Sequence, residues 1–256
     1  MKHMILPALL LALTAQLAAG VVHEALNYRV DDAEFKGYLA YDQGVAGKRP
    51  GILLAHEWWG LNDFAKAQAD KLAALGYAVL AVDMYGNGRN TTDPQIAQEW
   101  AGQVRGTPLM RQRIQAGLTA LMLDPHVDAG RIAAVGYCFG GSAVLELAFS
   151  GAKIRGVVTF HAGLTLPGPD DAGRIQAKFL VLHGADDPYA SRELISQFQD
   201  SLRQAKADWQ MVFYGNAVHS FTNPAAGNDN AKGAAYNPLA ARRSWEHMRL
   251  FLKEIL

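Results

Sequence analysis

The chain has one cysteine, and its neighbours are those of a nucleophile. Cys138 lies within Gly-Tyr-Cys-Phe-Gly at 136–140, after an apolar run at 132–135 and before a helical pattern at 140–149. This is the G-x-S-x-G nucleophile elbow with cysteine in place of serine. The glycines allow close approach of strand and helix, and the helix N-terminus favours a negative charge on sulfur. We therefore expect a covalent nucleophile, with the backbone N–H of Phe139 facing the oxyanion. The alternative is a small buried apolar side chain.

Two later motifs offer the partners that such a nucleophile needs. The segment 184–188 reads Gly-Ala-Asp-Asp-Pro after a predicted strand, and the segment 215–221 places His219 in a loop after the next one. The order nucleophile, acid, histidine is that of α/β-hydrolases, in which the carboxylate orients the imidazole. Taken singly, a turn-forming aspartate pair and a surface histidine are the more ordinary interpretations. Together with the elbow they predict a triad, in which either Asp186 or Asp187 can be the acid.

Apolar runs alternate with helical patterns along the rest of the chain. The short apolar runs are 52–55, 79–82, 132–135, 157–160, 179–183 and 210–214, and the helical patterns are 63–75, 109–123, 140–149, 191–205 and 239–256. This alternation predicts an α/β fold: a mostly parallel central sheet with helices on both faces. Residues 37–41 can add an antiparallel edge strand. No break in composition divides residues 21–256, so we expect a single domain.

Two long loops without periodicity follow predicted strands, at 85–94 and 222–238. Open α/β sheets bind ligands at the carboxyl ends of their strands, and long irregular loops there are usually functional. We expect an apolar pocket at this edge, lined by aromatic residues. The candidates are Trp58, Trp59, Tyr85, Phe139, Tyr189 and Phe221.

Composition limits the partners, and the first residues suggest export. Lys+Arg and Asp+Glu number 24 each, without the basic surplus of a nucleic-acid binder. Residues 1–20 have a basic start, a short apolar core and small residues at the end, which is the pattern of a secretory signal. The apolar run is too short to span a bilayer. We expect a mature protein that begins at Val21, is periplasmic or secreted, and has no membrane anchor. The alternative is an N-terminal helix packed on the domain.

Four motifs together resemble the dienelactone hydrolase family: Gly-Tyr-Cys-Phe-Gly-Gly from 136, Gly-Ala-Asp-Asp from 184, Val-His-Ser-Phe from 218, and His-Glu-Trp-Trp-Gly from 56. The resemblance runs from about residue 37 to the final helix. It implies an α/β-hydrolase fold, a Cys-His-Asp triad, no cofactor, and a small ester or lactone substrate cleaved through an acyl-enzyme. The spacing of the family's motif selects Asp187 as the acid.

The resemblance also assigns roles after the first buried strand. It implies that the backbone N–H of Trp58 is the second oxyanion donor and that Glu57 lies beside the thiol and modulates it. An ionised carboxylate there disfavours thiolate, and its displacement by substrate would release that restraint. The alternative for Glu57 is a cap for the helix that starts near Asn62.

One departure from the family concerns the substrate. Dienelactone hydrolases hold the substrate carboxylate with arginines in two loops, and the matching positions here are Asn87 and Asn223. Arg89 lies two positions away and is a candidate contact. We therefore expect a substrate other than dienelactone.

A metallohydrolase and a non-catalytic binding domain are the two alternative classes of function. His56, His161, His183 and His219 lie at or beyond predicted strand ends, as in a metallohydrolase, but no H-E-x-x-H pair is present. We expect no metal. A binding domain without catalysis would leave the combination of elbow, acid and histidine unexplained.

Overall fold

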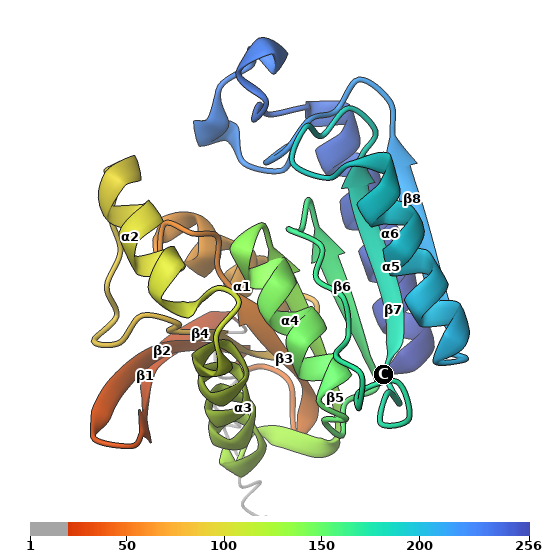
Figure 1. Ribbon diagram of the computed structural model, residues 1–256. Helices are drawn as coiled ribbons and strands as arrows, with labels where there is room; N and C mark the ends of the chain where they lie inside the picture. The colour runs from red at the N-terminus through yellow and green to blue at the C-terminus, as the bar shows by residue number, and fades with distance from the viewer. Residues whose placement is uncertain (1–19) are drawn as a thin grey trace, which may run out of the picture.

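The computed structural model describes residues 20–256. These residues fold around one eight-stranded sheet, whose arrangement can be followed in Figure 1. The strands are β1 (Val21–Val30), β2 (Ala33–Asp42), β3 (Arg49–Ala55), β4 (Ala78–Val82), β5 (Val127–Tyr137), β6 (Gly156–Phe160), β7 (Lys178–Gly184) and β8 (Trp209–Tyr214), in the order β1-β2-β4-β3-β5-β6-β7-β8. The pairs β1–β2 and β2–β4 are antiparallel, and all other neighbours are parallel. The predicted α/β-hydrolase fold, with its mostly parallel sheet, is confirmed.

Helices cover both faces of this sheet. Six α-helices are present within residues 20–256: α1 (Asp63–Ala73), α2 (Pro94–Val104), α3 (Pro108–Leu123), α4 (Phe139–Phe149), α5 (Arg192–Gln204) and α6 (Pro238–Ile255). Successive side chains of a strand point to opposite faces. In β3, Leu53 packs in the cluster that contains α3 and α4, whereas its neighbours Ile52 and Leu54 pack in the cluster that contains α1 and α6. The short apolar runs are therefore strands buried on both sides.

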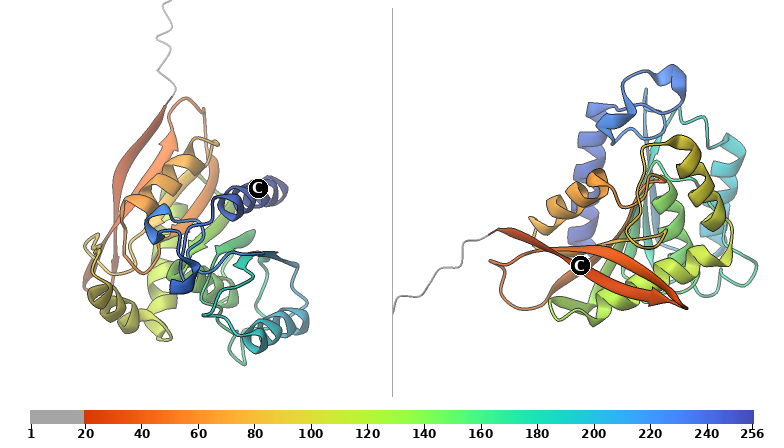
Figure 2. Two further views of the ribbon diagram at one scale, coloured as in Figure 1. Left: turned by 90° about the horizontal axis from the view of Figure 1, so that it is seen from above. Right: turned by 90° about the vertical axis from the view of Figure 1, so that its left-hand side faces the viewer.

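The amino-terminal strands differ from the prediction for residues 37–41. These residues do not form an edge, because β2 lies between β1 and β4, and β1 is the edge strand. The two strands form a long hairpin at one end of the sheet (Figure 2), with Val21 paired to Asp42 and Val30 to Ala33. Most of β1 is exposed or half-buried. Its sequence therefore lacks the apolar run that marks a central strand.

Helix α2 is a second element that the sequence pattern did not predict. It begins inside the region assigned to a loop, at Pro94, with Asp93 as N-cap accepting the Gln95 N–H. An N-cap aspartate followed by proline is a helix-start signal that could have located it. The outer face of α2 is exposed, so the helix has only a short run of apolar residues at helical spacing.

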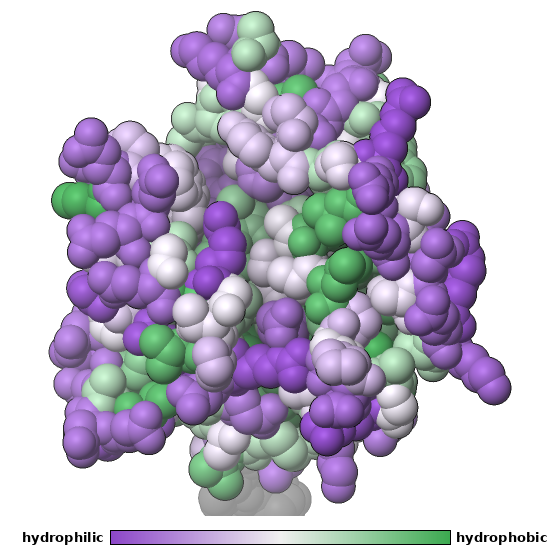
Figure 3. All heavy atoms as spheres, in the orientation of Figure 1, coloured by the Kyte–Doolittle hydropathy of each residue, from purple (hydrophilic) through white to green (hydrophobic). Residues whose placement is uncertain are grey.

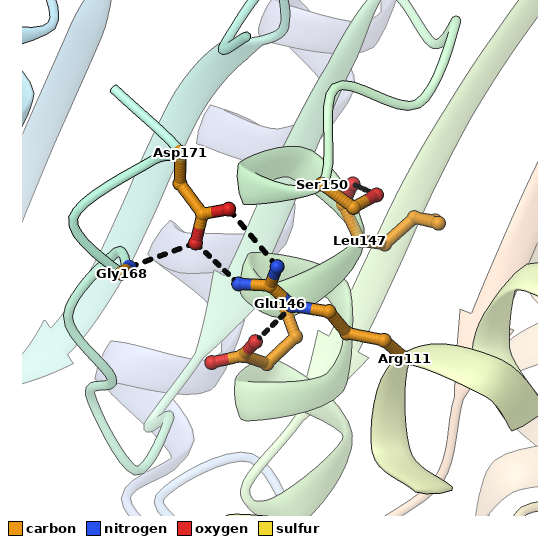
Figure 4. A network of polar contacts seen from close by, with 6 residues as sticks. All are labelled: Arg111, Glu146, Leu147, Ser150, Gly168 and Asp171. Atoms are coloured by element: carbon orange, nitrogen blue, oxygen red, sulfur yellow. Dashed lines mark hydrogen bonds and ion pairs between the residues drawn. The ribbon is translucent and has the colours of Figure 1, made fainter. Parts of the chain in front are cut away.

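A partly buried ion-pair network fixes the loop between β6 and β7 (Figure 4). Arg111 on α3 donates to Glu146 on α4 at 2.6 Å and forms two hydrogen bonds with Asp171, of 3.0 and 2.5 Å. Asp171 also accepts the Gly168 N–H at 2.7 Å. This bidentate contact pins a loop whose first residues reach the candidate active site.

Within residues 20–256, no helix is long and apolar enough to cross a membrane. The predicted secretory signal at 1–20 lies outside these residues apart from Gly20. On the face shown in Figure 3, a group of apolar side chains lies to the right of the centre, and hydrophilic side chains cover much of the rest of the face.

Candidate active site

Cys138 lies in a strained turn between β5 and α4. Its φ of 52° and ψ of −115° are in a region that residues other than glycine rarely adopt. A Cβ on Gly136 would lie 2.2 Å from the carbonyl oxygen of Gly140, and one on Gly140 would lie 2.2 Å from that of Ala55. Both glycines are thus required by close backbone approach, as the elbow motif predicts. Such strain is maintained where the surrounding structure holds the turn, as at many active sites.

The structure brings Cys138, His219 and Asp187 into one hydrogen-bonded chain. His219 Nε2 lies 3.0 Å from Cys138 Sγ, and His219 Nδ1 lies 2.9 Å from Asp187 Oδ2. The other oxygen of Asp187 accepts the Tyr189 N–H at 2.9 Å, which fixes the carboxylate. Asp187 is buried, whereas Asp186 is exposed. The geometry therefore singles out Asp187, the aspartate that the family spacing selects.

The surroundings of His219 favour its protonated form. Burial opposes the charged ring, but the negative charge of Cys138 and the hydrogen bond to Asp187 outweigh it and raise the pKa of His219 well above its ordinary value. An imidazolium stabilises a thiolate beside it. The arrangement can thus hold a thiolate–imidazolium pair and move a proton at Nε2.

The backbone N–H groups of Trp58 and Phe139 are the two candidate oxyanion donors. Trp58 follows the end of β3, and in the described part of the chain its N–H has no hydrogen-bond acceptor. Phe139 is the first residue of α4, so its N–H has no partner inside the helix. Both residues match the predicted oxyanion donors, and both donors are available.

Glu57 is buried and is held by the loop that carries His219. Ser220 Oγ donates to Glu57 Oε1 at 3.2 Å, and Asn223 Nδ2 donates to Glu57 Oε2 at 2.5 Å. Burial raises the pKa of Glu57, while the hydrogen bonds from Asn223 and Ser220 and the charge of His219 oppose this shift. The hydrogen bonds of Glu57 thus go to this loop rather than to the thiol. Asn62, not Glu57, caps α1, by accepting the Ala65 N–H.

A cavity of about 1000 Å³ opens beside His219. Trp58, Trp59 and Tyr189 line it, as expected of the aromatic candidates. Its further lining residues are Asn62, Asp63, Phe64, Asn90, Thr91, Thr92, Arg105, Ser142, Gly163, Leu164, Thr165, His219, Ser220, Asn223, Ala225, Ala226 and Ala234. Cys138 itself is not among the lining residues, but His219, whose Nε2 lies 3.0 Å from the Cys138 Sγ, is.

Four predicted pocket residues do not line the cavity, and one of them, Phe139, is fully buried at the start of α4. Phe221 is fully buried and packs against Tyr214 and His161. Tyr85 is buried too, and its hydroxyl donates to the carbonyl of Trp58 at 3.0 Å. Arg89 is turned back onto its own loop, where it donates to the carbonyls of Tyr85 and Gly86 and stacks over a tryptophan ring. In each case the side chain finds its partners in the fold, so the prediction of a pocket contact is corrected.

The sequence pattern missed Arg105 as a cavity residue. Its guanidinium lies 5.8 Å from the centre of the Phe139 ring, next to the elbow, and among residues 20–256 no carboxylate pairs with it. Arg105 is the C-cap of α2. Because α2 was not predicted, the position of Arg105 at the end of this helix was not predicted either.

The histidines of the metallohydrolase alternative do not converge. In the described part of the chain, no group of three or more His, Cys, Asp or Glu side chains is arranged to hold a metal ion. His161 contacts the His219 ring and Thr222, and neither ring nitrogen of the buried His183 has a hydrogen-bond partner.

Comparisons with known proteins agree with the fold and the motifs. Residues 35–256 match the model of the dienelactone hydrolase family. The solved structure m3DLH is 43% identical, covers 93% of this chain and 99% of its own, and superposes with a TM-score of 0.89. P91, a dienelactone hydrolase-like promiscuous phosphotriesterase from metagenomic libraries, is 41% identical with a TM-score of 0.88, over 92% of this chain and 99% of its own. An uncharacterized protein of Caenorhabditis elegans is 35% identical over 57% of this chain and 93% of its length.

Proposed function

Because the chain belongs to the dienelactone hydrolase family and is a hydrolase of ester or lactone bonds, we propose that it works through a Cys138–His219–Asp187 triad and an acyl-enzyme. The observation that carries this proposal is the continuous chain of hydrogen bonds from Cys138 Sγ through His219 to Asp187, set in a strained elbow beside a large cavity. A cysteine or histidine without a catalytic role would need neither this hydrogen-bond chain nor a strained turn.

The first half-reaction forms the acyl-enzyme. The Cys138 thiolate attacks the substrate carbonyl carbon, and the oxyanion accepts hydrogen bonds from the N–H groups of Trp58 and Phe139. When the intermediate collapses, the carbon–oxygen bond to the alcohol breaks and the leaving oxygen takes the proton from His219 Nε2. In a lactone this alcohol stays attached to the acyl group.

The second half-reaction returns the enzyme to its starting state. His219 Nε2 takes a proton from water, which attacks the thioester carbonyl. Collapse expels the Cys138 thiolate and releases the carboxylic acid. Asp187 accepts the Nδ1–H throughout, which holds the ring in the tautomer that both steps need.

Glu57 acts in this scheme as a modulator of the thiol through His219. Its carboxyl is fixed by Ser220 and Asn223; burial raises the pKa of Glu57, and the nearby charge of His219 opposes that rise. An ionised Glu57 stabilises the His219 imidazolium and so favours the thiolate indirectly, which is opposite in sign to the direct repulsion expected of a carboxylate that contacts the thiol. Glu57→Gln is expected to shift the pH dependence of Cys138 alkylation, and an unchanged profile would remove Glu57 from the mechanism.

The deciding experiment is a panel of uncharged esters and lactones assayed with wild type, Cys138→Ala and Cys138→Ser. We expect hydrolysis by wild type, an acyl adduct on the peptide that contains Cys138 when a slow ester is used, and no turnover by Cys138→Ala. Full activity of Cys138→Ala would overturn the mechanism. Binding of the esters without turnover would favour a binding domain, and loss of activity with EDTA that zinc restores would favour a metallohydrolase.

Phosphotriester hydrolysis is a second candidate activity, supported by the likeness to P91 over 92% of this chain. The Cys138 thiolate would attack phosphorus, the phosphoryl oxygen would occupy the same two N–H donors, and the leaving alkoxide would take the His219 proton. An uncharged triester assayed beside the ester panel tests this, and the absence of a thiol-bound phosphoryl adduct would count against it.

We also propose that residues 1–20 are a secretory signal and that the mature protein is periplasmic or secreted. The order of basic, apolar and small residues supports this, and so does the start of β1 at Val21. Mass spectrometry of protein from its native cell should find an N-terminus near Val21. An intact Met1 in a cytoplasmic fraction would refute export.

A further inference from the structure

His56, at the end of β3, is fully buried and uses both ring nitrogens on the backbone. Its Nδ1 lies 2.5 Å from the carbonyl oxygen of Glu57, and its Nε2 lies 3.2 Å from the backbone N of Met84. The N–H of Met84 can only donate, so Nε2 accepts and Nδ1 carries the proton. Burial lowers the pKa of His56, consistent with a neutral ring. The tautomer of this histidine is therefore fixed by its neighbours.

The carbonyl that His56 holds belongs to the peptide unit of an oxyanion donor. The C=O of Glu57 and the N–H of Trp58 are the two ends of one trans peptide, and they point in opposite directions. The Glu57 carbonyl also accepts the Gly60 N–H at 3.2 Å. With the carbonyl bound on one side, the Trp58 N–H must point to the other, where within residues 20–256 it has no acceptor.

The next peptide is held in a similar way by Tyr85. Its hydroxyl donates to the carbonyl of Trp58 at 3.0 Å. The rings of His56 and Tyr85 lie 5.1 Å apart, and both pack against Phe139, the residue with the other free N–H, at 6.1 and 5.5 Å. One aromatic cluster thus supports both oxyanion donors.

We propose that His56 is a positioning residue that sets the oxyanion hole, by donating from Nδ1 to the Glu57 carbonyl and so aiming the Trp58 N–H at the reacting carbonyl. It takes no part in proton transfer, and Tyr85 assists it by fixing the following peptide. This inference rests on the proposed thioester mechanism. Removing a single oxyanion donor costs roughly 10²–10³ in kcat, so an N–H that is present but misdirected should cost less.

The test distinguishes an effect on the oxyanion hole from an effect on the nucleophile Cys138. Alkylation of Cys138 by iodoacetamide occurs at a saturated carbon and forms no oxyanion, whereas ester hydrolysis forms one in each half-reaction. In His56→Leu we expect kcat on an uncharged ester to fall about 10- to 100-fold, with KM, the alkylation rate and the shape of the pH profile unchanged. His56→Asn, whose side-chain N–H lies the same number of bonds from Cα as Nδ1, should restore much of kcat.

Tyr85→Phe is a gentler second variant that removes only the hydroxyl. It should lower kcat severalfold and leave alkylation unchanged, even if His56→Leu fails to fold. An equal fall of alkylation and hydrolysis, or an unchanged kcat in the variants that fold, would overturn the inference. If wild type is alkylated normally but hydrolyses no ester, the proposed function fails instead.

Discussion

Asn223 Nδ2 donates a hydrogen bond of 2.5 Å to Glu57 Oε2, and Asn223 Oδ1 accepts the Ala225 N–H at 3.0 Å. Both ends of the amide are thus engaged by the protein, at a position where the family resemblance places an arginine that holds the substrate carboxylate. At the second such position, Asn87 has a φ of 56°, donates its N–H to the carbonyl of Glu34, and does not line the cavity.

The enzyme should therefore be a poor hydrolase of dienelactone and competent on uncharged esters. A hydrogen bond that involves a charged group contributes roughly 1.5–3 kcal/mol, against about 1 kcal/mol for a neutral one. Two lost arginine contacts correspond to roughly two orders of magnitude in selectivity. The measurement is kcat/KM for dienelactone and for its methyl ester. Asn223→Arg should raise the preference for the free acid about tenfold.

Two arginine variants serve as a matched pair in that assay. Any remaining preference for the acid should depend on Arg105, which lines the cavity without a carboxylate partner, and not on Arg89, which is tied to backbone carbonyls. Arg105→Ala should reduce it and Arg89→Ala should not. A strong wild-type preference for the acid that survives Arg105→Ala would contradict this view of the substrate.

Replacing the buried acid should be far more damaging than replacing its neighbour. Asp187→Asn removes the acceptor that fixes the His219 tautomer, and we expect kcat to fall by roughly 10²–10⁴. Asp186→Asn is the control, because this side chain is exposed and makes no contact with His219. Steady-state kinetics on one uncharged ester decides between them. Comparable losses in the two variants would mean that the acid is misassigned.

The elbow should not tolerate a methyl group on its second glycine. A Cβ at position 140 would lie 2.2 Å from the carbonyl oxygen of Ala55, so the backbone must move. We expect Gly140→Ala to destabilise the fold by roughly 3 kcal/mol, or about 10 °C in Tm. Gly102→Ala, in α2 with no atom near its added Cβ, should instead stabilise by up to about 1 kcal/mol. A Gly140→Ala protein as stable as wild type would show that the turn is looser than described.

Acid should destabilise the protein partly through His183. Burial lowers the pKa of this histidine, whose ring nitrogens have no hydrogen-bond partners. Below the ordinary value of 6.5, the unfolded chain takes up a proton that the folded chain resists. Its contribution to the free energy of unfolding is therefore intact above pH 6.5 and is lost as pH falls, by at most roughly 1.4 kcal/mol per pH unit.

Thermal unfolding between pH 5 and 8 measures this effect. His183→Leu should lose less Tm between pH 7 and pH 5 than wild type does. His23→Gln, which removes an exposed histidine from β1, is the control. A His183→Leu protein with the same acid sensitivity as wild type would assign the effect to other groups.

The parts of the site that could be predicted from sequence are those fixed by local backbone rules. The elbow around Cys138 needs glycines on both sides, and the order of Cys138, Asp187 and His219 follows the order of the strands. Central strands were recognisable because they are buried on both faces and so read as apolar runs. Each of these features restricts which residue types can occupy its positions, and this restriction is visible in the sequence.

The remaining parts depend on tertiary contacts that leave no such pattern. Strand β1 is mostly exposed, and α2 has a short apolar face, so neither carries a strong periodicity. Tyr85 and Phe221 are aromatic residues at the right edge of the sheet, but only the packed structure shows that they turn inward. The same holds for Glu57, whose partners lie 163 and 166 positions away.

Because these residues are far apart along the chain, the active site is completed late in folding. Cys138 and His219 are 81 positions apart, and Glu57 and Asn223 bracket most of the chain. Contacts between residues so distant in sequence form slowly, after loop closure across the whole sheet. Recovered esterase activity should therefore lag behind recovered helix signal during refolding. An ester assay would therefore measure the completely folded protein, because partly folded chains would have no esterase activity.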